Sequence, residues 1–221
     1  MLTKDLPLQR PLLRGWSHAL AVALALFGTI VLVNATRGDN LKQLSLLLYG
    51  TTVVLLFTIS ATYHLGRWAP PERARLRRVD HATIFVMIAG TYTPIAVTIL
   101  SGPARIALLA GIWALALLGV GLVLYRGPVR RGVLTALYLA LGWLSVAIMP
   151  LVIERVGWAG VANLAAGGLL YSVGAVAYAL KRPRLWASVF GYHEVFHLFV
   201  IAAGGAFYIF MLQEVVSLPI R

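Results

Sequence analysis

The chain has 221 residues, of which 60% are hydrophobic and only 12% are charged. A soluble domain carries about 25% charged residues, so the composition excludes an ordinary soluble fold and indicates a membrane protein. The formal net charge is +12, but the basic residues lie in short gaps between long apolar runs, which favours lipid headgroups over nucleic acid as their partners. Because the chain has no cysteine, a disulfide and a thiolate metal site are both excluded.

Seven stretches are apolar enough and long enough to cross a bilayer, for which a helix needs about 20 residues. In chain order they are residues 16–36, 43–65, 81–100, 104–125, 132–153, 159–180 and 193–216. The first is longer than the apolar region of a signal peptide and no clear cleavage site follows it, so we expect it to remain as a helix. Short connections predict one domain over residues 1–221, an all-α bundle of seven transmembrane helices.

The basic residues predict how this bundle lies in the membrane. Most of the 19 lysines and arginines precede the first span or follow the second, fourth and sixth. Because cytoplasmic loops are enriched in lysine and arginine, we expect a cytoplasmic N-terminus and an external C-terminus. The chain is then a multi-pass protein of the cell membrane, with membrane lipids as its immediate partners. Nothing in the sequence indicates an oligomeric state.

Ionisable side chains are costly inside a bilayer, and several lie at or near the ends of the predicted spans. His193 and His197 are four residues apart, so they share one face of the last helix. His64 ends the second span, and the count of crossings puts it at the same membrane face. Catalytic zinc sites use three protein ligands and keep a fourth position for water. We therefore predict zinc bound by His64, His193 and His197 just inside the cytoplasmic face.

The same count of crossings places two further side chains at this membrane face. Asp80 begins the third span, where it would accept a hydrogen bond from water at the open metal position and take its proton. The alternative is a simple ion pair of Asp80 with Arg77 or Arg78. Ser60 lies one turn from His64, and its hydroxyl would bind that water or a substrate carbonyl, or else bond back to its own helix.

Three other polar residues receive plainer interpretations. We interpret His18 as a polar residue at a polar depth, and His81 as the neighbour of a better candidate, Asp80. Residues 193–197 match the H-E-x-x-H pattern of zinc proteases, in which the glutamate is the general base. Here the motif opens the last helix, and the third-ligand segment of intramembrane metalloproteases is missing. We therefore expect Glu194 to be an interfacial carboxylate, with a direct chemical role as the alternative.

Three motifs and a shorter run can be read along the chain: Ser60-x-x-x-His64, Asp80-His81-x-x-Ile84-Phe85-x-x-Ile88-Ala89-Gly90-Thr91-Tyr92-Thr93-Pro94, Gly191-x-His193-Glu194-x-Phe196-His197 and, in the sixth span, Gly168-Leu169-Leu170-Tyr171. From about the first span to the last, this pattern resembles the hemolysin III family, the bacterial branch of the progestin and adipoQ receptors. The resemblance implies seven helices, a cytoplasmic N-terminus in a bacterial inner membrane, and zinc held by three histidines.

By motif, the family's zinc ligands fall on His64, His193 and His197, the aspartate near the zinc water on Asp80, and the serine on Ser60. One departure concerns the last helix, where many bacterial members carry a further histidine. This chain has Phe207 or a neighbour there. A role of that histidine therefore does not transfer, while the expected zinc ligands are unaffected.

The resemblance also implies a function. Because related receptors are reported to have weak ceramidase activity, we expect a zinc-dependent membrane hydrolase acting on a lipid amide or ester. The alternative is a non-catalytic receptor-like or membrane-homeostasis protein, in which a structural zinc ties helices together. A cytolysin, as the family name suggests, is disfavoured, because pore-forming toxins are usually secreted as soluble proteins and this chain is apolar from its first span onward.

Overall fold

The computed structural model describes residues 11–125, 129–183, 185–186 and 188–221. In these ranges the secondary structure is helical, apart from an isolated bridge between Trp186 and Phe190. The elements are α1 (Trp16–Ala35), α2 (Asn40–Leu65), α3 (Pro70–Ile99), α4 (Gly102–Tyr125), α5 (Arg131–Trp143), the 3-10 helix η1 (Leu144–Ile148), α6 (Met149–Leu180), α7 (Tyr192–Phe210) and the π-helix η2 (Met211–Val215). The all-α fold class is therefore confirmed.

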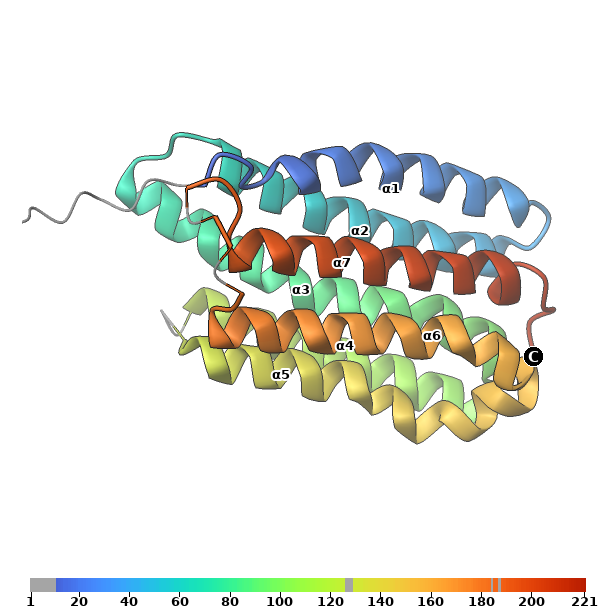
Figure 1. Cartoon of the computed structure of the whole chain (residues 1–221). Coiled ribbons are helices and arrows are strands. Elements are labelled where there is room, and N and C mark those ends of the chain that lie inside the picture. Colours follow the sequence, from blue (N-terminus) through green and yellow to red (C-terminus); the bar gives the residue numbers. More distant parts are fainter. Residues whose placement is uncertain (1–10, 126–128, 184, 187) are drawn as a thin grey trace, which may run out of the picture.

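Six helical stretches in the described part of the chain are long and apolar enough to cross a membrane, which supports a multi-pass membrane protein. One of them, Arg131–Leu180, joins the spans expected at 132–153 and 159–180. Gly157 interrupts this stretch with a φ of 70° and a ψ of 175°, a conformation that favours glycine. Figure 1 shows α5 and α6 lying side by side and running in opposite directions. The count of seven crossings and the orientation stay predictions.

Helix α3 begins earlier than expected. The sequence predicted a span that starts at residue 81 after a basic loop, whereas the helix starts at Pro70. Proline suits the first turn of a helix, and the Glu72 carboxylate accepts a hydrogen bond from the Ala69 backbone N–H at 3.3 Å, so the basic segment is capped and helical. Asp80 consequently lies about three turns inside α3 instead of at its start.

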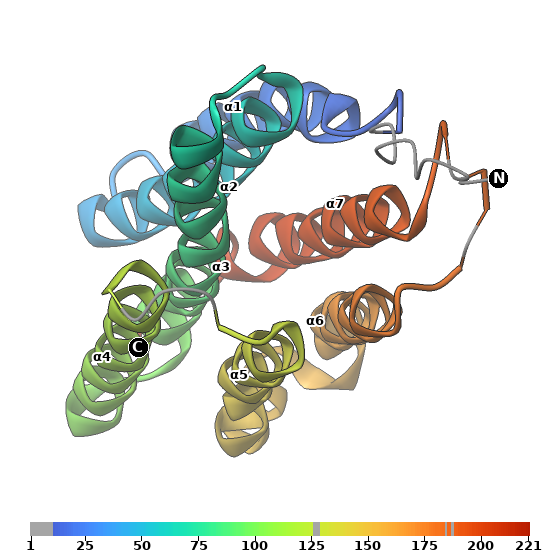
Figure 2. The same cartoon turned by 90° about the vertical axis from the view of Figure 1, so that its left-hand side faces the viewer.

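Packing places α3 at the centre of the bundle. Every residue from 89 to 100 is buried, whereas α1 and α4 expose large apolar side chains such as Leu24, Phe27 and Leu118. Exposed apolar surface of this kind is compatible with lipid as the solvent. Seen end-on in Figure 2, α7 lies between α1 and α2 on one side and α6 on the other. This arrangement brings the start of α7 close to the end of α2.

Close contact between α2 and α3 depends on a glycine. A Cβ atom at Gly90 would lie 2.2 Å from Thr52 Oγ1 and 2.9 Å from Thr52 Cβ. The Thr52 hydroxyl is itself fixed by donating to the Tyr49 carbonyl at 2.8 Å. Small residues at helix contacts let backbones approach in a membrane. Gly90 therefore keeps α2 and α3 close enough for side chains on both helices to share one site.

Replacing Gly90 by alanine should push α2 and α3 apart. We expect Gly90→Ala to lower the Tm of the purified protein, with a loss of about 1–3 kcal/mol as in other overpacked cores. Gly121→Ala on α4 is the matched control, because a Cβ there meets nothing within 4 Å. The control should leave the Tm unchanged or raise it slightly. Equal Tm values for the two variants would contradict the role given to Gly90.

Candidate metal centre

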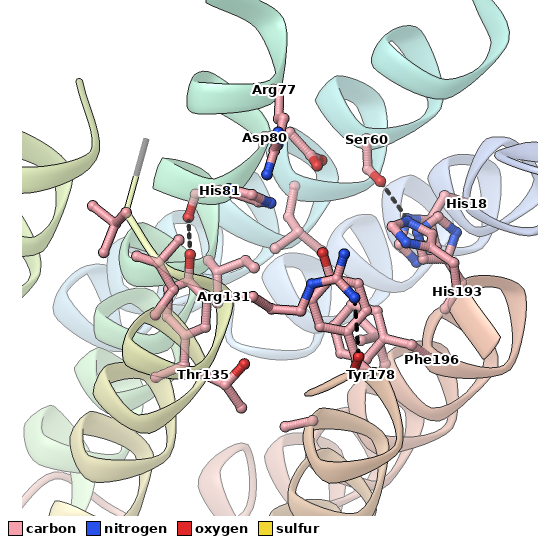
Figure 3. A pocket seen from close by; sticks show the side chains of 18 residues that line it. His18, Ser60, Arg77, Asp80, His81, Arg131, Thr135, Tyr178, His193 and Phe196 are labelled. Carbon is pink, nitrogen blue, oxygen red and sulfur yellow. Dashed lines mark hydrogen bonds between the residues drawn. The ribbon is translucent and has the colours of Figure 1, made fainter. Parts of the chain in front are cut away.

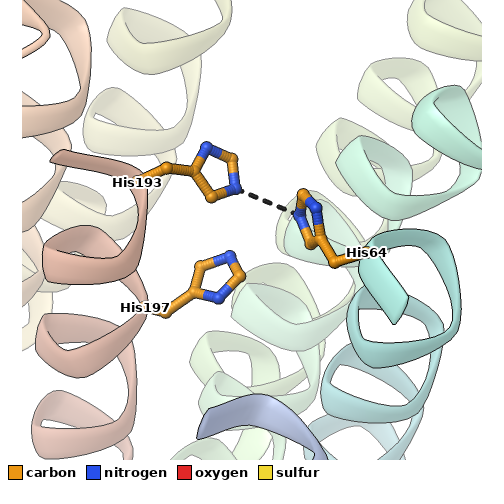
Figure 4. A group of neighbouring side chains, drawn as sticks. All are labelled: His64, His193 and His197. Carbon is orange, nitrogen blue, oxygen red and sulfur yellow. Dashed lines mark hydrogen bonds between the residues drawn. The ribbon is translucent and has the colours of Figure 1, made fainter. Parts of the chain in front are cut away.

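Three histidines meet at the end of the bundle where α2 ends and α7 begins. His64 lies in the last turn of α2, and His193 and His197 lie one turn apart at the start of α7. The Nε2 atoms of His193 and His64 are 3.0 Å apart (Figure 4). One ring nitrogen from each of the three residues lies within 4.8 Å of the others. The structure thus brings together the three residues that the sequence predicted as ligands.

This donor set fits a zinc ion. Nitrogens around one tetrahedral zinc, with Zn–N bonds of about 2.0–2.1 Å, lie about 3.3 Å from each other. The Nε2 atoms of His64 and His193, 3.0 Å apart, are close to that separation. The ring nitrogens of the three histidines lie within 4.8 Å of one another, so only a small inward movement of the side chains is needed to bind one ion. His64 and His197 are buried, with 7% and 2% exposure. Three imidazoles and no thiolate suit a divalent transition metal, whose identity as zinc stays a prediction.

Glu194, between the two histidines of α7, holds the start of that helix. Its Oε2 accepts a hydrogen bond from the Gly191 backbone N–H at 2.7 Å, and its Oε1 pairs with Arg14 Nε at 2.7 Å. The residue is only 2% exposed, so its carboxylate is buried among protein groups, in a capping role that was not predicted from the sequence. Because both carboxylate oxygens are engaged, the geometry argues against a general base at Glu194. The position of glutamate at N3 of a helix was the available signal.

A small cavity of about 70 Å³ adjoins the trio. Its lining includes His193 and His197 together with Asp80, Ser60 and His18 (Figure 3). These residues come from α1, α2, α3 and α7, so their meeting depends on the tertiary arrangement. The two residues predicted to act beside the metal, Asp80 and Ser60, therefore lie next to two of its predicted ligands.

The alternative roles considered for Asp80 and Ser60 are not observed. None of the salt bridges among the described residues involves Asp80, and Arg78 instead donates to the Leu124 carbonyl at 3.0 Å. Among the described residues, the Ser60 hydroxyl makes no hydrogen bond to its own helix and instead lies 2.8 Å from His18 Nδ1 on α1. Both side chains are therefore available to the cavity.

His18 belongs to the site, which corrects its interpretation as a polar residue at a polar depth. It is 3% exposed, and its ring stacks on that of His197 with centroids 3.7 Å apart and planes 10° from parallel. The contact arises because the first turn of α1 packs against α7. The sequence signal was present, since His18 starts the first span at the face shared with His64. His81 also lines the cavity, and its carbonyl accepts a hydrogen bond from Tyr138 at 2.9 Å.

The chain is similar to several known proteins. A family model described as haemolysin-III related matches residues 7–208. The hemolysin-3 homolog of Bacillus subtilis (strain 168) is 32% identical over 208 residues, which cover 92% of this chain and 93% of the relative. Hemolysin-3 of Bacillus cereus is 31% identical over 207 residues, covering 92% and 90%. The human monocyte to macrophage differentiation factor is 26% identical over 200 residues, covering 87% and 79%.

Removal of one imidazole should abolish metal binding. We expect about one zinc per chain in the purified wild-type protein and almost none in His193→Ala, because two remaining ligands do not make a zinc site. Elemental analysis of both proteins measures this. His81→Ala is the matched control, because His81 lines the same cavity but is outside the trio, and it should keep its zinc. A zinc-free wild type, or full zinc in His193→Ala, would refute the assignment.

Proposed function

Because the chain belongs to the haemolysin-III-related family of membrane proteins, we propose that it is a zinc-dependent membrane hydrolase that cleaves a lipid amide or ester. One observation carries the proposal: a trio of imidazoles lies beside a cavity that also presents a carboxylate and a hydroxyl, those of Asp80 and Ser60. A purely structural metal site needs neither of these two groups. A site that uses three protein ligands leaves a fourth position for a reactant.

The chemistry divides among the side chains of the cavity. When zinc is bound, it supplies Lewis acidity, which polarises a carbonyl and makes a water molecule more acidic. Asp80 takes the proton of the attacking water and returns it to the leaving nitrogen or oxygen as the carbonyl carbon–heteroatom bond breaks. Ser60 donates a hydrogen bond to the carbonyl oxygen, on which negative charge develops. His18, with its proton on Nδ1, donates to the Ser60 hydroxyl oxygen across their 2.8 Å contact, which leaves the hydroxyl proton for the carbonyl.

A second cavity supports a lipid as the substrate. It has a volume of about 300 Å³ and a nearly continuous apolar lining, which includes Met87, Ile88 and Leu164. The apolar cavity adjoins the site directly, because the two cavities share six lining residues: Leu56, Ile84, Tyr138, Ala175, Phe196 and Val200. Pockets of this size and character hold small ligands through apolar contacts. An acyl chain in the apolar cavity would bring its amide or ester carbonyl towards Asp80.

Neutralising Asp80 tests the mechanism. We expect Asp80→Asn to lower turnover of lipid amides and esters by roughly 100-fold or more, because an amide side chain does not accept the water proton. Glu72→Gln, at the exposed start of α3, is the control and should keep wild-type turnover. Zinc content should be equal in all three proteins. Equal turnover in wild type and Asp80→Asn would remove the mechanism, and no turnover with a zinc-dependent Tm would favour a structural metal.

We further propose seven crossings with a cytoplasmic N-terminus, in which the stretch Arg131–Leu180 passes out and back at Gly157. Because the chain has no cysteine, single cysteines at the exposed residues Ser101, Ser188 and Ser217 report their sides of the membrane. A membrane-impermeant maleimide should label positions 101 and 217 in intact cells, and position 188 only after permeabilisation. If Arg131–Leu180 crossed once, positions 101 and 188 would be labelled and 217 would not.

A further inference from the structure

Two guanidinium groups line the cavity beside Asp80, and the proposed hydrolysis gives them no role. Arg77 comes from α3 and Arg131 is the first residue of α5. Figure 3 shows Arg77 near Asp80 and His81, and Arg131 beside Tyr178. No carboxylate of the described residues lies within 4.0 Å of either guanidinium. The cavity lining therefore carries two guanidinium groups and one carboxylate, that of Asp80, and neither guanidinium forms an ion pair within the described part of the chain.

Arg131 is held in position without using most of its donors. Its guanidinium carbon lies 4.5 Å from the centre of the Tyr178 ring and 5.6 Å from that of Tyr192. Among the described residues, only Nη1 contacts hydrogen-bond acceptors, at 3.4 Å from both the Tyr178 carbonyl and the Tyr192 hydroxyl. A guanidinium has five N–H donors in a planar fork. Two aromatic rings thus fix the group, while donors remain for a ligand.

The positive-inside bias alone does not explain this placement. That bias requires only that basic residues lie at the cytoplasmic end of a span, in any orientation. Arg75 satisfies it from an exposed position on α3, outside the cavity lining. Arg131 instead lies against two tyrosines at the wall of the proposed active site. A planar guanidinium fork in such a place is the usual partner of a carboxylate or phosphate.

We propose that Arg131 and Arg77 bind an anionic group, a carboxylate or a phosphate, at the head of the lipid substrate. This inference rests on the proposed function and names its substrate class, an anionic acyl lipid instead of a neutral one such as ceramide. The acyl chain lies in the apolar cavity, the scissile carbonyl faces Asp80 and Ser60, and the anionic head meets Arg131. All of these side chains line the two adjoining cavities.

Matched pairs of lipids, in which one member carries an anionic group and the other does not, test the proposal. N-oleoylglycine is compared with its neutral methyl ester, and oleoyl-glycerol phosphate with mono-oleoyl glycerol, on the full-length zinc-loaded protein in detergent. Binding is measured in the Asp80→Asn background, so that turnover does not consume the probes. We expect the anionic member of at least one pair to bind roughly tenfold more tightly, a ratio typical of one charge-assisted contact. Equal affinities within both pairs would overturn the proposal.

Variants assign the preference to the two arginines. Arg131→Gln and Arg77→Gln should each reduce the preference severalfold, and the double variant should abolish it while keeping the affinity for the neutral lipids. That retained affinity shows that the apolar cavity is still folded. Arg75→Gln removes one positive charge from the same end of α3 and should leave the preference for anionic lipids unchanged. A preference that persists in the double variant, or falls equally in Arg75→Gln, would refute the assignment to Arg77 and Arg131.

Two further results separate this inference from the proposed function. If the anionic lipid binds preferentially but wild-type protein cleaves neither lipid, the anion site is supported and the hydrolase is not. If wild-type protein cleaves both members of a pair with equal kcat/KM and binds them equally, the hydrolase is supported and the anion site is overturned. N-acetylglycine and inorganic phosphate serve as soluble competitors. Either one binding as tightly as the anionic lipid would overturn its assignment to a lipid head.

Discussion

Polar side chains among lipid chains must find partners within the protein, because no water is there to replace them. At the end of the bundle where α2 meets α7, several polar groups find such partners. His64 faces His193, Ser60 faces His18, and Glu194 joins the first turn of α7 to Arg14. The buried His18 Nε2 and His197 Nδ1 have no hydrogen-bond partner among the described residues. Three charged groups are also unpaired: Asp80 lacks a salt bridge within the described chain, and Arg77 and Arg131 lack a carboxylate. These are the groups to which we assign chemistry and substrate binding.

Sequence reasoning reached the histidine trio because two simple rules sufficed. A spacing of four residues put His193 and His197 on one helix face, and the parity of the crossings put His64 at the same end. Whether the number of crossings between two residues is odd or even determines at which end of the bundle each residue lies, but not which helices are neighbours. The stacking of His18 on His197 requires that α1 packs against α7. That order is set by side-chain fit across the whole bundle, so the role of His18 was missed.

Local chemistry produced two more differences between expectation and structure. The basic segment before Asp80 forms the first turns of α3, because Pro70 and Glu72 start the helix earlier than hydropathy suggests. Glu194 was considered as an acid–base group or an interfacial carboxylate, yet it caps α7 and binds Arg14. In both cases a carboxylate satisfies free N–H groups at a helix start. Hydropathy and metal-ligand spacing do not detect that role.

The stacking of His18 on His197 has a mechanical consequence. Helix α1 exposes Leu20, Leu24 and Phe27 on its outer surface, where the proposed arrangement puts lipid, while its first turn touches a predicted metal ligand. A sideways displacement of α1 would separate the stacked rings and weaken the hold on Ser60. Bilayer thickness and lateral pressure act on α1 directly. The stacked contact therefore joins an outer helix of the bundle to a predicted metal ligand.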